Sequence, residues 1–93
     1  MDLVAFQELM ACTYGERDRA RGIDATVAWL TEELGELARA VRKGTREEQL
    51  HELGDVLAWL ASLAAQLDLS LDEAARRYDA GCPRCGANPC ACP

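Results

Sequence analysis

Two features of this 93-residue chain predict an all-α fold. Apolar residues recur at intervals of three and four along most of the chain, which places them on one side of a helix. Glycines and capping sequences interrupt this pattern, and no alternating strand pattern is present. We therefore expect an all-α domain of four helices in residues 1–80, followed by a short cysteine-rich tail in residues 81–93.

The first helix is predicted by an apolar stripe made of Leu3, Phe6, Leu9, Met10 and Tyr14. It is expected to end in the charged stretch between Gly15 and Gly22, where the apolar spacing is lost. Cys12 lies in this helix without another cysteine nearby in the sequence, so it is interpreted as a small core residue.

The second and third helices are predicted to pack as an antiparallel hairpin. The second begins near Asp24 or Thr26, either of which can cap it, and stops at Gly44. The third begins after Thr45, which forms a capping-box sequence with Glu48. Both helices carry apolar stripes with matching spacing, and these are expected to face each other: Leu30, Leu34, Leu37 and Val41, then Leu50, Leu53, Leu57, Leu60 and Ala64.

A short fourth helix is predicted after Ser70, because Ser70 and Glu73 repeat the capping-box spacing. It should extend to about Asp79, and Gly81 separates it from the cysteine-rich tail.

The acidic composition restricts the classes of partner. Ten Lys and Arg residues against 16 Asp and Glu residues give a net charge of −6, which argues against binding duplex nucleic acid. The first residues are acidic where a signal peptide needs cations, and no apolar run reaches the roughly 18 residues of a membrane span. We expect a cytoplasmic protein without membrane association, in which cysteines stay reduced.

Two acidic pairs dominate the predicted hairpin. Glu33 and Glu36 lie three residues apart on the second helix, and Glu52 and Asp55 repeat this spacing on the third. An antiparallel turn brings the pairs opposite each other, where a hard divalent cation such as Mg²⁺ would neutralise them. The alternative is a pair of solvated helix faces, which an acidic composition produces easily.

The segments around these pairs read Trp29-Leu30-Thr31-Glu32-Glu33-Leu34-Gly35-Glu36-Leu37 and Glu52-Leu53-Gly54-Asp55-Val56-Leu57. They resemble the E-x-x-E and E-x-x-D motifs of the MazG-like nucleoside triphosphate pyrophosphohydrolases, and the likeness covers roughly residues 3 to 78. The resemblance implies an all-α four-helix bundle formed by helical hairpins, in a dimeric or tetrameric enzyme that binds Mg²⁺, with Mn²⁺ as an alternative. It implies that Glu33, Glu36, Glu52 and Asp55 are the metal ligands.

The resemblance also implies the reaction, which converts a nucleoside or deoxynucleoside triphosphate and water into a monophosphate and pyrophosphate, as in the housecleaning of nucleotide pools. Glu32 or Glu33 is the candidate that orients the attacking water, although Glu32 would equally suit an exposed ion pair with an arginine. Arg39 and Lys43 are candidate phosphate-binding residues, or else they complement the helix C-terminus.

Trp29 and Trp59 lie one turn from the acidic pairs and are candidates for sandwiching a nucleobase, with burial in the core as the alternative. His51, the only histidine, is interpreted as a surface residue.

The tail contains Cys82, Cys85, Cys90 and Cys92, with spacing C-x2-C-x4-C-x-C. Because few apolar residues are available to fold this segment, we expect a structural Zn²⁺ bound by the four thiolates. The second pair could instead find its metal partners in another subunit, and a reactive thiol cluster or disulfides are the alternatives.

Two alternatives to the leading function remain open. One is a phosphoribosyl-ATP pyrophosphohydrolase, which has a similar fold and reaction. The other is a non-catalytic helical interaction module, in which the zinc-bearing tail is the functional part.

Overall fold

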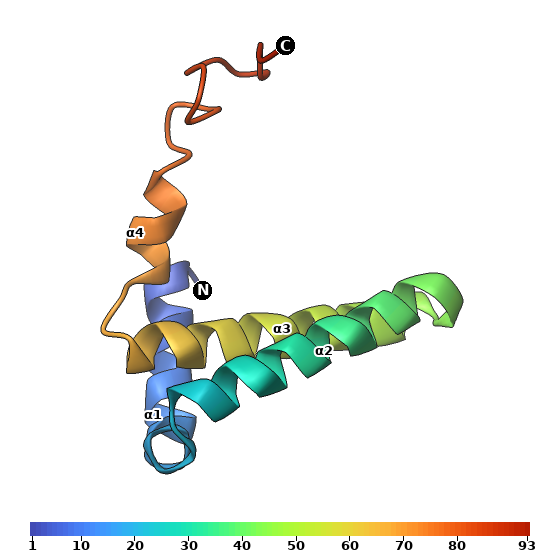
Figure 1. Cartoon of the computed structure of the whole chain (residues 1–93), viewed down its shortest axis with the longest axis vertical. Helices are drawn as coiled ribbons and strands as arrows, with labels where there is room; N and C mark the ends of the chain where they lie inside the picture. Colours follow the sequence, from blue (N-terminus) through green and yellow to red (C-terminus); the bar gives the residue numbers. More distant parts are fainter.

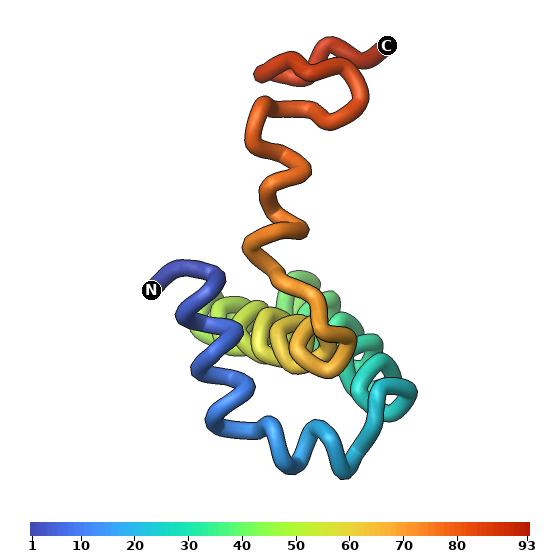
Figure 2. The backbone as a smooth tube through the Cα atoms, turned by 90° about the vertical axis from the view of Figure 1, so that its left-hand side faces the viewer, coloured from blue at the N-terminus to red at the C-terminus, as the bar shows by residue number.

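The computed structural model describes residues 1–93 as four α-helices without a strand, so the all-α prediction is confirmed. The helices are α1 (Leu3–Arg21), α2 (Ile23–Lys43), α3 (Arg46–Gln66) and α4 (Leu71–Arg76). Helices α2 and α3 lie side by side as an antiparallel hairpin, and α1 crosses them (Figure 1). Helix α4 points away from the hairpin and carries the C-terminal tail at its end (Figure 2).

The turn of the hairpin is formed by the residues that the sequence indicated. Gly44 ends α2, and its N–H donates to the Ala40 carbonyl at 2.8 Å. A Cβ at Gly44 would lie 2.8 Å from the same oxygen, so any larger residue would disturb this close approach. Both halves of the predicted capping box are present, because Glu48 N donates to Thr45 Oγ1 at 3.2 Å and Thr45 N donates to Glu48 Oε1 at 3.4 Å.

The junction between α1 and α2 differs from the prediction. Helix α1 continues through the charged stretch to Arg21, where an ion pair of 2.8 Å joins Asp18 and Arg21 across one helical turn. Gly22, with a φ of +91°, is both the C-cap of α1 and the N-cap of α2. Neither Asp24 nor Thr26 caps α2. The Thr26 hydroxyl lies inside the helix and donates to the Gly22 carbonyl at 2.8 Å.

Helix α4 starts where it was predicted but is shorter. The Ser70 hydroxyl accepts from Glu73 N at 3.2 Å, and the helix ends at Arg76, before the expected Asp79. The side chain of Gln7 ties this segment to α1: its Nε2 donates to Leu69 O at 2.7 Å, and its Oε1 accepts from Leu71 N at 2.8 Å. The start of α4 is therefore anchored, although its far end extends from the hairpin.

The expected leucine packing between α2 and α3 is present only in part in a single chain: Ala64 is buried, Leu30 and Leu37 are half-buried, and the other predicted positions are exposed. Small and polar side chains lie between the helices instead, since Gln49 Nε2 donates to the Ala40 carbonyl at 3.1 Å and Gln66 Nε2 donates to Thr26 Oγ1 at 2.8 Å. Small side chains allow two helices to approach closely, and the leucine stripes then point outward. We call the exposed set the leucine surface: Leu34, Val41, Leu50, Leu53, Leu57 and Leu60.

One chain alone does not complete the predicted bundle. The only buried apolar residues are Ala40, Ala61 and Ala64, and Cys12 is exposed instead of buried. The radius of gyration is 15.4 Å, whereas a compact chain of this length has about 12 Å. The chain therefore leaves apolar surface that it cannot cover by itself. None of its helices combines the length and apolarity needed to cross a membrane.

Candidate functional site

The predicted acidic residues of α2 and α3 face a common space; we call Glu32, Glu33, Glu36, Glu52 and Asp55 the acidic cluster. The pKa of the Glu33 carboxyl is raised, first by burial and then by the negative charges of Asp55, Glu52, Glu36 and Glu32. Two of these charges lie on the other helix, so acidic residues of both helices are near Glu33. Three of the five side chains are half-buried, and Glu32 and Glu36 are exposed.

His51 lies at the edge of the acidic cluster. Its Nε2 is 3.3 Å from Asp55 Oδ2, and the possible ligand atoms of His51, Glu52 and Asp55 all lie within 4.8 Å of one another. The His51 side chain is 70% exposed, as predicted for a surface residue. This contact with Asp55 was not foreseen, although the spacing of four residues on one helix could have indicated it.

The cationic residues of α2 lie beside the acids. A cavity of about 240 Å³ is lined by Glu36, Arg39, Ala40, Lys43, Gly44, Glu48 and Glu52. Arg39 and Lys43 therefore share one cavity with members of the acidic cluster, whereas Arg42 does not line it. A ligand with both metal-binding and anionic groups would meet both kinds of side chain here.

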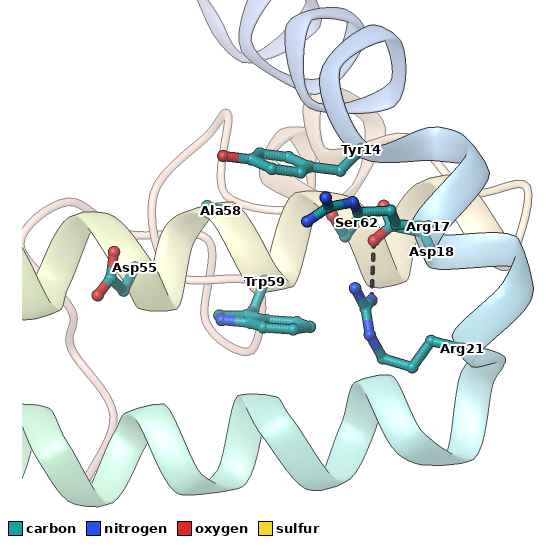
Figure 3. Close-up of a pocket in the computed structure, with 8 residues that line it drawn as sticks. All are labelled: Tyr14, Arg17, Asp18, Arg21, Asp55, Ala58, Trp59 and Ser62. Atoms are coloured by element: carbon teal, nitrogen blue, oxygen red, sulfur yellow. Dashed lines mark hydrogen bonds and ion pairs between the residues drawn. The ribbon is translucent and has the colours of Figure 1, made fainter.

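A second cavity, of about 270 Å³, lies where α1 meets α3 (Figure 3). Its lining residues are Tyr14, Arg17, Asp18, Arg21, Asp55, Ala58, Trp59 and Ser62. None of the four residues from α1 was predicted as part of a site: Tyr14 was assigned to the apolar stripe, and the helix was expected to end in the stretch that contains Arg17, Asp18 and Arg21. Their spacing of three and four residues from Tyr14 onward could have indicated that the helix continues with a polar face. Asp55 brings this cavity next to the acidic cluster.

The two tryptophans contact each other. The rings of Trp29 and Trp59 are stacked with centroids 5.9 Å apart and an angle of 12° between their planes. The Arg21 guanidinium lies 4.6 Å from the centroid of the Trp59 ring, a cation–π contact. In this arrangement no gap for a nucleobase exists between the indoles, but Trp29 is 45% exposed and offers a surface to a ligand.

A polar network fixes Arg21 at this place. Asp18 is 3% exposed, and its Oδ1 accepts from Arg21 Nη1 at 2.8 Å (Figure 3). Arg21 Nη1 also lies 3.5 Å from Thr26 Oγ1, which in turn accepts from Gln66. A buried carboxylate requires such a partner, since desolvation without one is costly. The network joins α1, α2 and α3 next to Trp59.

The cysteine tail, residues 81–93, brings its four thiols together. Cys82 Sγ and Cys92 Sγ are 3.7 Å apart, and Cys85 Sγ and Cys90 Sγ are 3.9 Å apart. Hydrogen bonds from the backbone N–H groups of Ala91 and Ala87 lower the pKa of Cys85 to about 6. The neighbouring sulfurs, Cys90 first, raise the pKa of Cys92 to about 11. Cys85 therefore forms a thiolate, the form that binds metals, more readily than Cys92 does.

Comparison with known proteins identifies the family. A sequence model described as the MazG nucleotide pyrophosphohydrolase domain matches residues 21–80, which is more than half of the chain. The chain belongs to the MazG nucleotide pyrophosphohydrolase family. The match includes all of α2, α3 and α4 and the whole acidic cluster, but neither the main part of α1 nor the cysteine tail.

One curated relative of this MazG chain is the uncharacterized protein YpjD from Bacillus subtilis (strain 168). It is 48% identical over an alignment that covers 54% of each protein, so the chain spans about half the length of this relative. The description of the matching family model names nucleotide pyrophosphohydrolysis as the activity of the family.

Proposed function

We propose that this protein is a magnesium-dependent nucleoside or deoxynucleoside triphosphate pyrophosphohydrolase, which releases a monophosphate and pyrophosphate in the housecleaning of nucleotide pools. The observation that carries the proposal is the position of Glu33, whose carboxyl feels the charges of two acids on α2 and two acids on α3. Such crowding of carboxylates is unfavourable unless a cation accompanies them.

The residues present fit magnesium. All the donors of the acidic cluster are carboxylate oxygens, which Mg²⁺ and Mn²⁺ prefer over softer metals. Glu33, Glu36, Glu52 and Asp55 would hold the ion, and their mutual repulsion would be relieved by it. Bound magnesium would supply the positive charge that hydrolysis of a triphosphate requires.

The side chains in and around the acidic cluster have different roles in the proposed reaction. Glu33 is the candidate that orients the attacking water beside the metal. Glu32, exposed on the same helix, helps to orient this water. Arg39 and Lys43 bind the outer phosphates in the cavity that they share with Glu36 and Glu52.

The nucleoside end is proposed to reach toward the tryptophans. Trp59 lines the second cavity together with Asp55, so a nucleotide whose phosphates meet Asp55 has its sugar and base near this ring. The exposed Trp29 ring gives the base a stacking surface. The base could be sandwiched between the two indole rings only if the rings moved apart.

A second copy of the chain is proposed to cover the leucine surface as a homodimer or homotetramer. Leu50 is 71% exposed and Val41 is 64% exposed, and both line a groove of about 420 Å³ with Leu37 and Leu53. Exposed apolar patches of this kind mark association sites. Two hairpins joined through these stripes would together form a bundle of four long helices, whereas the hairpin of one chain supplies only two.

We also propose a cytoplasmic location, where thiols stay reduced.

The test of the activity is a substrate panel with identified products. The protein is incubated with ribo- and deoxyribonucleoside triphosphates and with phosphoribosyl-ATP, in the presence of Mg²⁺ or Mn²⁺ or of a chelator. We expect a monophosphate and pyrophosphate, formed only with metal. Formation of a diphosphate and phosphate, or no turnover of any compound, would overturn the proposal. A preference for phosphoribosyl-ATP would assign the protein to the reaction of histidine synthesis instead.

A substitution in the acidic cluster completes the test. Glu36→Gln removes one carboxylate and keeps the size of the side chain, so turnover should be lost while the helices stay intact by circular dichroism. Glu47→Gln is the matched control, because Glu47 is an exposed acid of α3 that lines neither cavity.

A further inference from the structure

The cysteine tail holds the second group of convergent donor atoms, and the proposed hydrolysis does not use it. The sulfur atoms of Cys82, Cys85, Cys90 and Cys92 all lie within 4.8 Å of one another. In a tetrahedral zinc site with Zn–S bonds of about 2.3 Å, the sulfurs lie about 3.8 Å apart. The pairs Cys82–Cys92 and Cys85–Cys90 lie 3.7 Å and 3.9 Å apart.

We propose that these four cysteines bind one Zn²⁺ ion as a closed, structural site within a single chain, independent of the acidic cluster. Four thiolates are the donor set of structural zinc sites, and they complete the coordination sphere. No position is left for water or substrate, so this zinc does not take part in hydrolysis. Magnesium is excluded by the same donors, because it prefers oxygen ligands.

The backbone of the tail is arranged around the sulfurs. Cys82 N donates to Ala87 O at 3.0 Å and Gly86 N donates to Cys82 O at 2.7 Å, which closes the loop that carries the first pair of cysteines. Gly86, with a φ of +74°, permits this turn. Gly81 allows a close approach, since a Cβ there would lie 2.7 Å from Ala87 O.

Backbone N–H groups also point at the sulfurs. Ala91 N donates to Cys85 Sγ at 3.3 Å, and Cys92 N donates to Cys90 Sγ at 3.4 Å. Hydrogen bonds of this kind stabilise metal-bound thiolates and fix their orientation. They come from the same short segment as the ligands, which supports a site formed within one chain instead of between two.

The position of the tail supports independence from the proposed active site. It lies at the end of α4, on the far side from the hairpin turn (Figure 1), and no polar contact joins it to α2 or α3. No bulky apolar residue lies in residues 81–93 to form a core. Metal binding is therefore the interaction that can order this segment.

The test is the metal content of the whole chain, purified without chelators and measured by elemental mass spectrometry. We expect one zinc per chain, at least a fivefold loss in Cys85→Ser and in Cys90→Ser, and full retention in Cys12→Ser. Cys12 is the matched control because it is an exposed thiol on α1, far along the chain from the tail. Substitution with Co²⁺ should give the visible absorption of a tetrahedral cobalt thiolate.

Each other outcome counts against the proposal. Iron in place of zinc, or a chain mass reduced by the hydrogens lost in forming disulfides, would overturn the identity of the site. Zinc content that is unchanged in Cys85→Ser would overturn the ligands. The single-chain arrangement is tested with a monomeric variant of the leucine surface, which should still hold one zinc per chain, and loss of zinc on dissociation would overturn it.

Discussion

The acidic cluster and the cysteine tail each bring together side chains suited to a metal ion, but they are built in different ways. The acids come from two helices, in residues 32–36 and 52–55, and helical geometry holds them opposite each other. The thiols come from 11 consecutive residues without a helix. The oxygen donors suit magnesium, and the sulfur donors suit zinc. Under the two proposals, each group of donors therefore selects a different metal.

The largest expected effect is on catalysis. Asp55→Asn should lower kcat/KM by about 100-fold or more, since a charged group that holds the proposed cation is lost. Its zinc content should stay at the wild-type value. Parallel measurement of hydrolysis and metal content would show this, and loss of zinc in this variant would mean that the two regions are coupled.

The next effect concerns assembly. Leu53 is 54% exposed, so Leu53→Glu should change the stability of an isolated chain by no more than about 0.5 kcal/mol. If a second copy covers this residue, the buried charge should dissociate the oligomer to the 10.2 kDa chain and lower the melting temperature.

Sedimentation analysis checks this prediction. Leu69→Glu is the control, because Leu69 is 59% exposed but lies outside the hairpin. Equal effects of the two substitutions would contradict a specific interface on the leucine surface.

A smaller and local effect is expected from zinc removal. A zinc-selective chelator should increase hydrogen exchange and proteolysis in residues 81–93 and leave α2 and α3 protected. Hydrolysis with added Mg²⁺ should change less than about twofold, because a closed thiolate site lacks an open position for substrate. Complete loss of activity would contradict the separation of the two regions.

The smallest effect is a pH dependence of stability in the acidic cluster. Because the pKa of Glu33 is raised in the folded protein, the folded state binds this proton more tightly than the unfolded state does. The stabilisation is complete below the unfolded value of 4.5 and is lost as the pH rises through the folded value.

Without metal, Glu33→Gln should therefore melt a few degrees higher than the wild type at pH 7, and this difference should vanish toward pH 4. Magnesium should reduce the difference at pH 7 by stabilising the wild type. Thermal melts across this pH range, with and without Mg²⁺, provide the measurement, and a variant less stable than the wild type at pH 7 would refute the assigned repulsion.

Helix ends that depend on neighbouring residues could be predicted from the sequence. Gly44, the Thr45–Glu48 capping box and Ser70 act within one or two turns, so their local chemistry decides the structure. The convergence of the acids was also predictable, because it follows from helical spacing and a short turn. The clustering of the thiols was anticipated from the spacing of the four cysteines in the sequence.

Long-range packing could not be predicted in the same way. Periodicity shows that Leu50 and Leu53 share one side of a helix, but it does not say whether α2 or another chain covers that side. The contribution of α1 was missed for a similar reason: Asp18 and Arg21 form a pair that is stable only where α1 meets Thr26 and Trp59. Such residues look like a charged helix end until the neighbouring helices are known.

The stacked indoles have a practical consequence. Trp29 and Trp59 are the only two tryptophans of the chain, and Trp59 lines the same cavity as Asp55. Almost all ultraviolet emission excited at the indole band must therefore originate beside the carboxylates. The unmodified protein carries its own optical probe, and titrations with cations or nucleotides could be followed without attaching a dye.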